Sequence, residues 1–357
     1  MIPFSVLDLC PIIQGGSAAQ SFRNALDLAQ HAEQWGYRRY WIAEHHSLVG
    51  VASAATSVVI AHIGAGTRTI RIGAGGIMLP NHAPLLIAEQ FGTLESLYPG
   101  RIDLGLGRAP GSDQVTSQAL RRDPMAGDDF PKEVGELMYW FSPEQPGQSV
   151  VAVPGAGLKI PLWILGSSTW GAQFAAANGL PFAFASHFAP QQMMHALELY
   201  RAGFKPSDWL DKPYAMLGIN VIAADTDEEA KLLYTSRQQS TLANRTGRRS
   251  QLPPPDADFE NKLGPMERSI LDEVLPGTVL GSPESVKAGL EKFIARTGAD
   301  ELIVAAAIYD HAKRLRSYEI TAKVRDGMSD AAPGGGAKAK VPAGLTERLL
   351  RKGEGAG

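Results

Sequence analysis

The chain has 357 residues, of which 44% are hydrophobic and 20% are charged, and its formal net charge is −3. This is ordinary globular composition with enough apolar residues for a sizeable core, and the near-neutral charge disfavours a nucleic-acid or membrane-surface partner. The one cysteine, Cys10, excludes an internal disulfide. Neither a signal-peptide pattern nor an apolar stretch of about 20 residues occurs, so we expect a cytoplasmic protein without membrane spans.

Strand-like and helical patterns alternate along the chain from its first residues. Runs of β-branched and aromatic residues predict strands, and apolar residues at helical spacing predict helices. The expected strands are residues 4–9, 39–43, 70–78, 101–106, 160–165, 182–185, 214–224 and 301–306. The expected helices are residues 17–35, 52–65, 84–97, 129–141, 170–178, 190–202, 225–244, 283–294 and 310–324. This α/β alternation favours a (β/α)8 TIM barrel over a doubly wound sheet.

Two long segments predict insertions after strands 4 and 7 of this barrel. The first covers residues 111–158, with a hairpin expected near 148–153, and the second covers residues 245–265 and contains three consecutive prolines. Both segments are candidate lids over a site. We expect residues 1–328 to form the barrel and residues 329–357, rich in glycine, alanine, proline and lysine, to be a disordered tail.

The expected helix at residues 52–65 is apolar on nearly every face. Such a helix is buried on more than one side. Because one side can face the sheet and the other suits a partner subunit, the pattern predicts a homodimer.

Three polar side chains, Glu44, His45 and His46, follow directly after the second expected strand. Residues at the carboxyl end of a parallel strand face the ligand site in barrels and open α/β sheets. A lone histidine there is usually structural, bonded to a carbonyl or solvated. The run of three leaves a structural and a functional interpretation both open.

Two further strand ends together predict an anion site. Arg108 follows the fourth expected strand and offers a planar set of donors that suits a phosphate or carboxylate. Gly166, Ser167 and Ser168 precede a helix whose first amides and dipole also suit an anion. Taken alone, the glycine–arginine pair at Arg108 is a common turn, and Ser168 is an ordinary helix N-cap. Taken together, the two segments favour a phosphate site. The spacing matches neither a Walker loop nor a dinucleotide fingerprint.

Gly75 and Gly76 lie near the end of the third expected strand. Glycines there leave room for a flat ligand against the backbone, or they mark a crowded bend of the barrel.

These motifs resemble the bacterial luciferase-like family of flavin-dependent monooxygenases, whose fold is a (β/α)8 barrel. The resemblance covers residues 1–325 and is nearest to the single-chain, non-luminous subgroup that has the sequence Gly-Arg-Ala-Pro-Gly. It rests on residues 43–46, 75–80, 100–108, 107–111 and 165–168, which occur in the family's order.

The resemblance implies roles for individual residues. His45 matches the family's catalytic histidine, with Glu44 and His46 beside it in the pocket and Glu44 tuning its pKa near neutrality. The Gly75–Gly76 bond falls where the family has a non-proline cis peptide behind the isoalloxazine. The implied cofactor-binding residues are Gly75, Gly76, Arg108, Gly166, Ser167, Ser168 and Trp170. His187, after the sixth strand, is expected in the same pocket or on a surface loop.

The implied reaction is that of an oxidoreductase in which reduced FMN and O2 form a flavin hydroperoxide that oxygenates a small apolar substrate. Pocket walls expected at Leu7, Ile77, Met78 and Trp170 leave aldehydes, alkanes, thioethers and aromatics open. Gly107 replaces the reactive cysteine of luciferases proper, so neither thiol chemistry nor light emission is expected. With no NAD(P)H fingerprint in the chain, a separate NAD(P)H:flavin reductase is expected to supply the reduced cofactor.

Three alternatives remain at this point. Relatives on the same fold use a deazaflavin for hydride transfer, and other relatives bind flavin without turnover. A metal hydrolase using His45 and His46 is disfavoured, because metal sites need three or four ligands and no matching cluster is evident at the other strand ends. No metal is therefore predicted.

Overall fold

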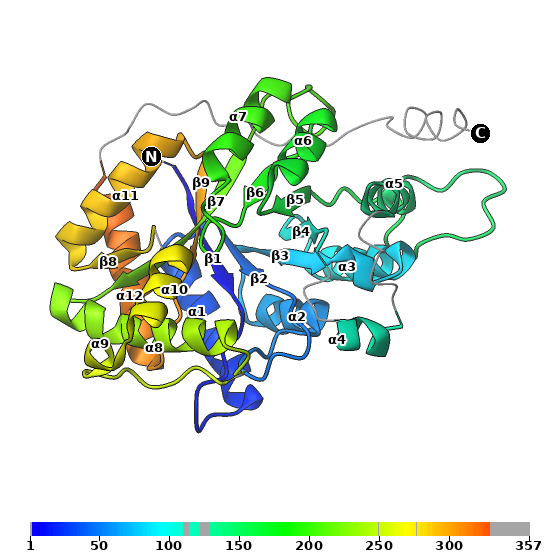
Figure 1. Ribbon diagram of the computed structural model, residues 1–357. Coiled ribbons are helices and arrows are strands. Elements are labelled where there is room, and N and C mark those ends of the chain that lie inside the picture. Colours follow the sequence, from blue (N-terminus) through cyan, green and yellow to red (C-terminus); the bar gives the residue numbers. More distant parts are fainter. Residues whose placement is uncertain (1, 110–113, 122–128, 249, 276, 329–357) are drawn as a thin grey trace.

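The computed structural model describes residues 2–109, 114–121, 129–248, 250–275 and 277–328. Strands and helices alternate along it, as the colours of Figure 1 follow. The strands are β1 (Phe4–Asp8), β2 (Arg39–Ile42), β3 (Arg71–Met78), β4 (Ile102–Gly107), β5 (Leu162–Gly166), β6 (Phe182–Phe184), β7 (Ala215–Ala223), β8 (Val279–Gly281) and β9 (Glu301–Ala305). The helices are α1 (Ala18–Gln34), α2 (Thr56–Gly66), α3 (Pro84–Leu97), α4 (Gln114–Ala119), α5 (Phe130–Phe141), α6 (Thr169–Ala177), α7 (Met193–Gly203), α8 (Asp227–Arg245), α9 (Phe259–Lys262), α10 (Pro265–Val274), α11 (Pro283–Thr297) and α12 (His311–Asp326), with a short 3-10 helix η1 (Leu79–Asn81) after β3.

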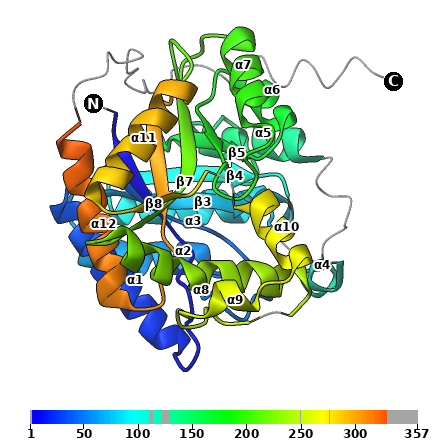
Figure 2. The same cartoon turned by 60° about the vertical axis from the view of Figure 1, so that its left-hand side comes forward.

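Eight of these strands form a closed parallel barrel in the order β1-β2-β3-β4-β5-β6-β7-β9, and β9 pairs back onto β1. The strand β7 pairs with β9 over residues 216–220 and with β8 over residues 221–223. The short strand β8 therefore extends the sheet beyond the barrel. Helices surround the strands in Figures 1 and 2. The predicted (β/α)8 fold is confirmed.

The strands are apolar because both of their faces are covered. Every residue of β1, β4 and β7 is buried, as expected for parallel strands with helices outside and side chains inside the barrel. Outward-facing residues such as Val6 belong to the large core beneath the helices. Inward-facing residues such as Leu7, Trp41 and Trp163 form a second cluster, in which the two indole rings pack edge to face at 5.2 Å.

An ionic layer of Arg39, Asp103 and Glu301 lies across the barrel interior at the amino ends of β2, β4 and β9. The guanidinium of Arg39 donates to both carboxylates at 2.7 Å, and all three side chains are at most 4% exposed. Arg71 also pairs with Asp103 at 2.6 Å, and Ser5 donates to Glu301. Burial alone would raise the pKa of Asp103, but Arg39 and Arg71 lower it.

The observed elements differ from the expected ones in a few places. No strand occurs among residues 148–153, where Val150 and Val153 are exposed and pair with no other segment of the described chain, so the predicted hairpin is wrong. The structure adds α4, α9, α10 and β8, which the sequence patterns did not predict. The helix expected from residue 52 begins at Thr56. The expected tail at residues 329–357 lies outside the described residues.

Among the described residues, no helix combines the length and the hydrophobicity that a membrane span requires.

Candidate active site

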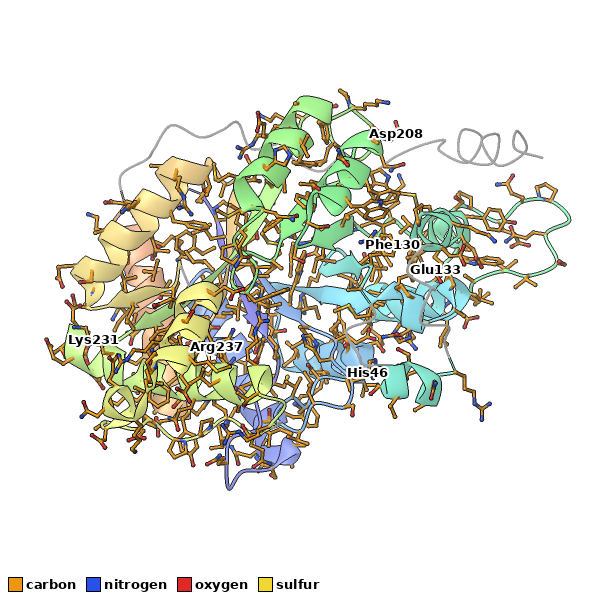
Figure 3. All side chains as sticks on the ribbon, viewed as in Figure 1. His46, Phe130, Glu133, Asp208, Lys231 and Arg237 are labelled. Atoms are coloured by element: carbon orange, nitrogen blue, oxygen red, sulfur yellow. The ribbon has the colours of Figure 1, made fainter. Side chains whose placement is uncertain are left out.

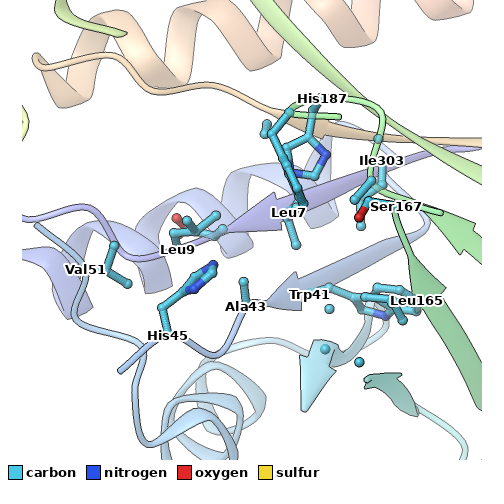
Figure 4. Close-up of a pocket in the computed structure, with 18 of the residues that line it drawn as sticks. Leu7, Leu9, Trp41, Ala43, His45, Val51, Leu165, Ser167, His187 and Ile303 are labelled. Atoms are coloured by element: carbon cyan, nitrogen blue, oxygen red, sulfur yellow. The ribbon is translucent and has the colours of Figure 1, made fainter. Parts of the chain in front are cut away.

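A cavity of about 490 Å³ opens at the carboxyl ends of the barrel strands. Residues near these ends line it on β1 to β7 and on β9, and loops and the helix α8 complete its wall. Figure 4 shows part of this lining, in which Leu7, Leu9 and Val51 form an apolar surface. The barrel thus brings residues from many separate segments to one pocket.

His45 lines this cavity as predicted, and Figure 4 shows its ring pointing into the space beside Leu9 and Ala43. The backbone just beyond β2 stays extended because the amide of Ala43 donates to Asp8 and that of Glu44 donates to Gly76. Side chains alternate along such a segment. Ala43 and His45 therefore face the cavity, and Glu44 faces the opposite side.

Glu44 lies behind the cavity wall, at 1% exposure, and neither it nor His46 is among the described residues that line the cavity. Its carboxylate accepts hydrogen bonds from the rings of His46 at 2.7 Å and His82 at 2.9 Å, and from the amide of Met78 at 3.1 Å. Burial would raise the pKa of Glu44, but the bonds from His46 and His82 lower it to about 2. Glu44 thus joins the ends of β2 and β3, a different place from the one expected beside His45.

The sequence reasoning missed His82, although it follows β3, the strand next to β2. Potential ligand atoms of Glu44, His46 and His82 lie within 4.8 Å of one another. A three-residue cluster therefore exists where none was expected, and it contains His46 but not His45. Its groups already satisfy one another by hydrogen bonds.

The glycines of β3 expose backbone to the cavity. The bond between Gly75 and Gly76 is cis, as the resemblance implied, and both residues line the cavity. A Cβ atom on Gly76 would lie 2.7 Å from the carbonyl oxygen of Gly105, and one on Gly107 would lie 2.9 Å from the sulfur of Met78. No larger residue fits at Gly76 without a shift of the strands, whereas at Gly107 the flexible side chain of Met78 could move instead.

The residues expected to form an anion site line the cavity at the ends of β4 and β5. The guanidinium of Arg108 lies over the ring of Trp170 at 4.3 Å, and Ser167 also lines the cavity there. Ser168 occupies the N-cap position of α6, but its side chain makes no capping hydrogen bond to the helix. The ordinary N-cap interpretation therefore does not account for this hydroxyl. Gly166 completes the predicted set of lining residues.

His187 lies in the loop after β6 and points into the cavity, where its ring packs against the backbone of Gly218. Burial, followed by the positive charges of Arg237 and His45, lowers the pKa of His187 to about 3. Its ring is therefore neutral at neutral pH. Its Nδ1 is buried without a hydrogen-bond partner in the described part of the chain.

Of the four apolar wall residues expected, Leu7, Met78 and Trp170 line the cavity. Ile77 does not, because the alternation of β3 turns it outward into the core beneath the helices. Of the two lid candidates, the segment 245–265 contributes Ser250 and Leu252 to the lining.

Three lining residues of α8, Arg237, Ser240 and Asn244, were not predicted. They lie within a polar helix whose sequence resembles a solvated surface, and they are far from any strand end. No pattern in the sequence distinguishes them.

Comparison with known proteins places these observations in one family. A model of the family described as luciferase-like monooxygenase matches residues 2–301. The chain is 55% identical to YvbT of Bacillus subtilis (strain 168) over 321 residues, covering 90% of this chain and 96% of that protein. It is 53% identical to the luciferase-like monooxygenase of Escherichia coli (strain K12) over 327 residues, covering 91% and 97%. It is 30% identical to the N-acetyl-S-alkylcysteine monooxygenase of Bacillus subtilis (strain 168) over 332 residues, covering 90% and 97%.

Solved structures resemble the same barrel. Apo-MsnO8 superimposes with a TM-score of 0.85 at 36% identity, covering 91% of this chain and 99% of that one. The FMN complex of the oxygenating constituent of 3,6-diketocamphane monooxygenase from Pseudomonas putida superimposes with a TM-score of 0.68 at 20% identity, covering 90% of this chain and 97% of that one. An F420-dependent secondary alcohol dehydrogenase superimposes with a TM-score of 0.66 at 14% identity, covering 90% of this chain and 98% of that one. The last two likenesses concern the fold alone.

Proposed function

We propose, because the chain belongs to the luciferase-like monooxygenase family, that it uses reduced FMN and O2 to oxygenate a small, largely apolar organic molecule. Family membership implies an oxidoreductase. The observation that carries the finer proposal is the arrangement of Arg108, Ser167 and Ser168 at the mouth of a cavity that also contains His45. A phosphate group and a reacting ring would have separate places in it.

The residues present fit FMN. Arg108, the two serine hydroxyls and the first amides of α6 would hold the phosphate, since a guanidinium and a helix N-terminus both favour an anion. The backbone at Gly75 and Gly76 offers a surface without side chains for the flat ring system. When bound and reduced, FMN supplies the electrons for the reaction of O2 with the substrate.

The protein's own contribution is to orient the reactants, exclude water and move protons. His45 is the imidazole on the cavity side of the β2 end and would donate or accept a proton at the reacting centre. Leu7, Leu9 and Val51 cover the neighbouring wall with apolar surface, which protects a reactive oxygenating species from water. His187, kept neutral by its surroundings, would act as a hydrogen-bonding group in this pocket.

The reduced cofactor would come from a separate NAD(P)H:flavin reductase. The purified chain alone should then oxidise NADH no faster than a solution of free FMN, and stoichiometric NADH oxidation by the chain would contradict this.

The apolar residues left exposed on α2 and α3 support a homodimer. Val58 is 67% exposed on α2, and Leu86 and Leu97 are 45% and 58% exposed on α3, which packs beside α2. Sedimentation of the purified protein should give twice the mass of the chain, and a Val58→Glu variant should give the mass of a monomer.

The phosphate site can be tested by binding. A charge-assisted hydrogen bond contributes on the order of 1.5–3 kcal/mol, so Arg108→Ala should weaken FMN binding about ten- to a hundredfold. Arg23→Ala is a matched control, because Arg23 lies on α1, bonded to Gln20 and outside the cavity lining. An unchanged FMN affinity in Arg108→Ala would contradict the assignment.

The reaction can be tested by adding anaerobically reduced FMN to the protein, admitting O2, and following flavin absorbance. A flavin–oxygen species that decays slowly supports the monooxygenase, and His45→Ala should keep FMN binding but lose productive oxygenation. Binding without reaction would indicate a flavin-binding protein without turnover. A preference for F420 over FMN would indicate the deazaflavin alternative, which the same phosphate site would suit.

A further inference from the structure

Arg237 is a cation in the cavity wall that has no counterion among the residues that the structure describes. It lies in the middle of α8, and Figure 3 shows it toward the middle of the molecule, whereas Lys231 of the same helix lies at the edge. Ser240 and Asn244, three and seven residues further on, line the same cavity. Residues at this spacing share one face of a helix. We call these three residues the α8 stripe.

Arg237 is half-buried, and its guanidinium has no partner among the described residues. Within the part of the chain that the structure describes, it makes no hydrogen bond or ion pair, and its Nε has no contact with solvent. Burial lowers the pKa of Arg237 from its ordinary value. The other arginines of the barrel interior differ: Arg314, which also lines the cavity, pairs with Asp8 at 2.7 Å, and Arg39 pairs with two carboxylates. A desolvated cation without a partner is unfavourable, and a bound anion would relieve this.

The described residues of the cavity lining include no anion free to serve Arg237. Among the described lining residues the only carboxylate is that of Asp8, and it already accepts from Arg314, Tyr40 and the amide of Cys10. The other ionisable groups of the described lining are His45, His187, Arg108 and Arg314, none of which is an anion. Tyr234 also lies near Arg237, but a phenol is neutral at neutral pH. Since no described residue supplies an anion for Arg237, a bound ligand is the natural source of one.

The α8 stripe is separate from the predicted phosphate site. Arg108 follows β4 and the serines follow β5, whereas α8 follows β7. In the closed ring of eight strands, β7 lies four strands from β3, on the side opposite Gly75 and Gly76. With the flavin ring on the β3 side, the α8 stripe would face it across the space left for the substrate.

We propose that the α8 stripe binds a carboxylate group of the substrate, so that the molecule oxygenated is an apolar compound that carries a carboxylate. This inference rests on the proposed function for the identity of the cavity as the substrate site. A guanidinium forms paired hydrogen bonds to a carboxylate, and the hydroxyl of Ser240 and the amide of Asn244 are further donors. Leu7, Leu9 and Val51 would hold the apolar remainder.

The test compares two probes of equal length, octanoate and octanamide, by calorimetric titration of the full chain without cofactor. Wild type should bind octanoate at least about tenfold more tightly than octanamide. Arg237→Gln should lose this preference, and Arg237→Lys should restore part of it because it retains a cation. Arg248→Gln is the matched control: Arg248 is an exposed arginine just beyond α8, outside the cavity lining, and its loss should leave the preference unchanged.

Thermal unfolding gives a second readout. Because Arg237 has no partner in the described part of the chain, Arg237→Gln should be at least as stable as wild type, whereas removing one half of an ion pair would be destabilising. A marked loss of stability would overturn the proposal. So would equal binding of the two probes by wild type, or no binding of either.

FMN titrations separate this inference from the proposed function. Arg237→Gln should keep the FMN affinity of wild type, and a loss would assign Arg237 to the cofactor site and overturn the inference. If wild type binds no FMN but still prefers octanoate, the proposed function fails and the carboxylate site stands.

Discussion

Replacing Glu44 with glutamine tests whether this carboxylate holds the ends of β2 and β3 together behind the cavity. Glu44 accepts hydrogen bonds from the rings of His46 and His82 and from the amide of Met78, and it is 1% exposed. Glutamine has nearly the same size but no charge and only one acceptor oxygen. At least one buried donor therefore loses a partner, which is costly inside a protein.

The pKa of Glu44 gives the size of the effect. It lies at about 2 instead of the ordinary 4.5, because the histidine bonds outweigh the effect of burial. At about 1.4 kcal/mol for each tenfold change in an ionisation constant, this stabilises the folded state by on the order of 3 kcal/mol at neutral pH. The folded pKa lies below the unfolded one, so the stabilisation is fully present above pH 4.5 and is lost as the pH falls toward 2. Between pH 7 and pH 3.5 this stabilisation shrinks by about 1.4 kcal/mol.

Urea denaturation followed by tryptophan fluorescence at several pH values measures this difference. Glu33→Gln is the control. The carboxylate of Glu33 accepts hydrogen bonds from the amides of Arg68, Thr69 and Ile70, and it lies outside the cavity lining. Burial raises the pKa of Glu33, but these hydrogen bonds lower it below its ordinary value. Both variants should lose stability, but only Glu44→Gln should also weaken FMN binding. A Glu44→Gln protein as stable as wild type at pH 7, or a difference that is the same at pH 3.5, would refute the reasoning.

Three further predictions concern the barrel itself. Arg39→Met leaves two buried carboxylates without their main partner and should cost about 3–5 kcal/mol of unfolding free energy; a loss below about 1 kcal/mol in urea denaturation would contradict the importance of the ionic layer. In Gly105→Ala the new Cβ would clash with the carbonyl oxygen of Ala74 on β3, so we expect a loss of about 1–3 kcal/mol and a lower Tm, and an unchanged Tm would disagree. Cys10 is buried, and burial raises the pKa of its thiol, so a disulfide reagent should label it only in urea; rapid labelling of the native protein would show the thiol to be accessible.

The fold could be predicted from the sequence wherever an element is long and its ends are marked. The helix Pro84–Leu97 was predicted with both bounds, because proline begins it and Tyr98, Pro99 and Gly100 form the turn that follows. The strand β8 could not be predicted, since three residues carry no periodicity. It forms because β7 continues three residues beyond its pairing with β9 and leaves a free edge. The predicted hairpin at residues 148–153 failed because an apolar run predicts a strand only where another strand can pair with it.

The site could be predicted where its residues follow strands. His45, Arg108 and Ser167 all line the cavity, because the carboxyl ends of parallel strands converge in a barrel. Glu44 belongs to the same run as His45, but the alternation of an extended backbone turns it to the other side. Arg237 gave no signal, since an arginine within a helix is usually solvated. Only the structure reveals that it faces a cavity and that no described carboxylate pairs with it.

The ionic layer has a consequence for the growing chain on the ribosome. Arg39 and Glu301 are separated by 262 positions, and Asp103 lies between them in sequence. Contacts between residues so distant in sequence form only after most of the chain has been made. A nascent chain that has reached only β7 would have to bury Arg39 with one of its two carboxylates missing. Burying Arg39 with Asp103 alone would be unfavourable, so the ionic layer favours closure of the barrel only after β9 has been made.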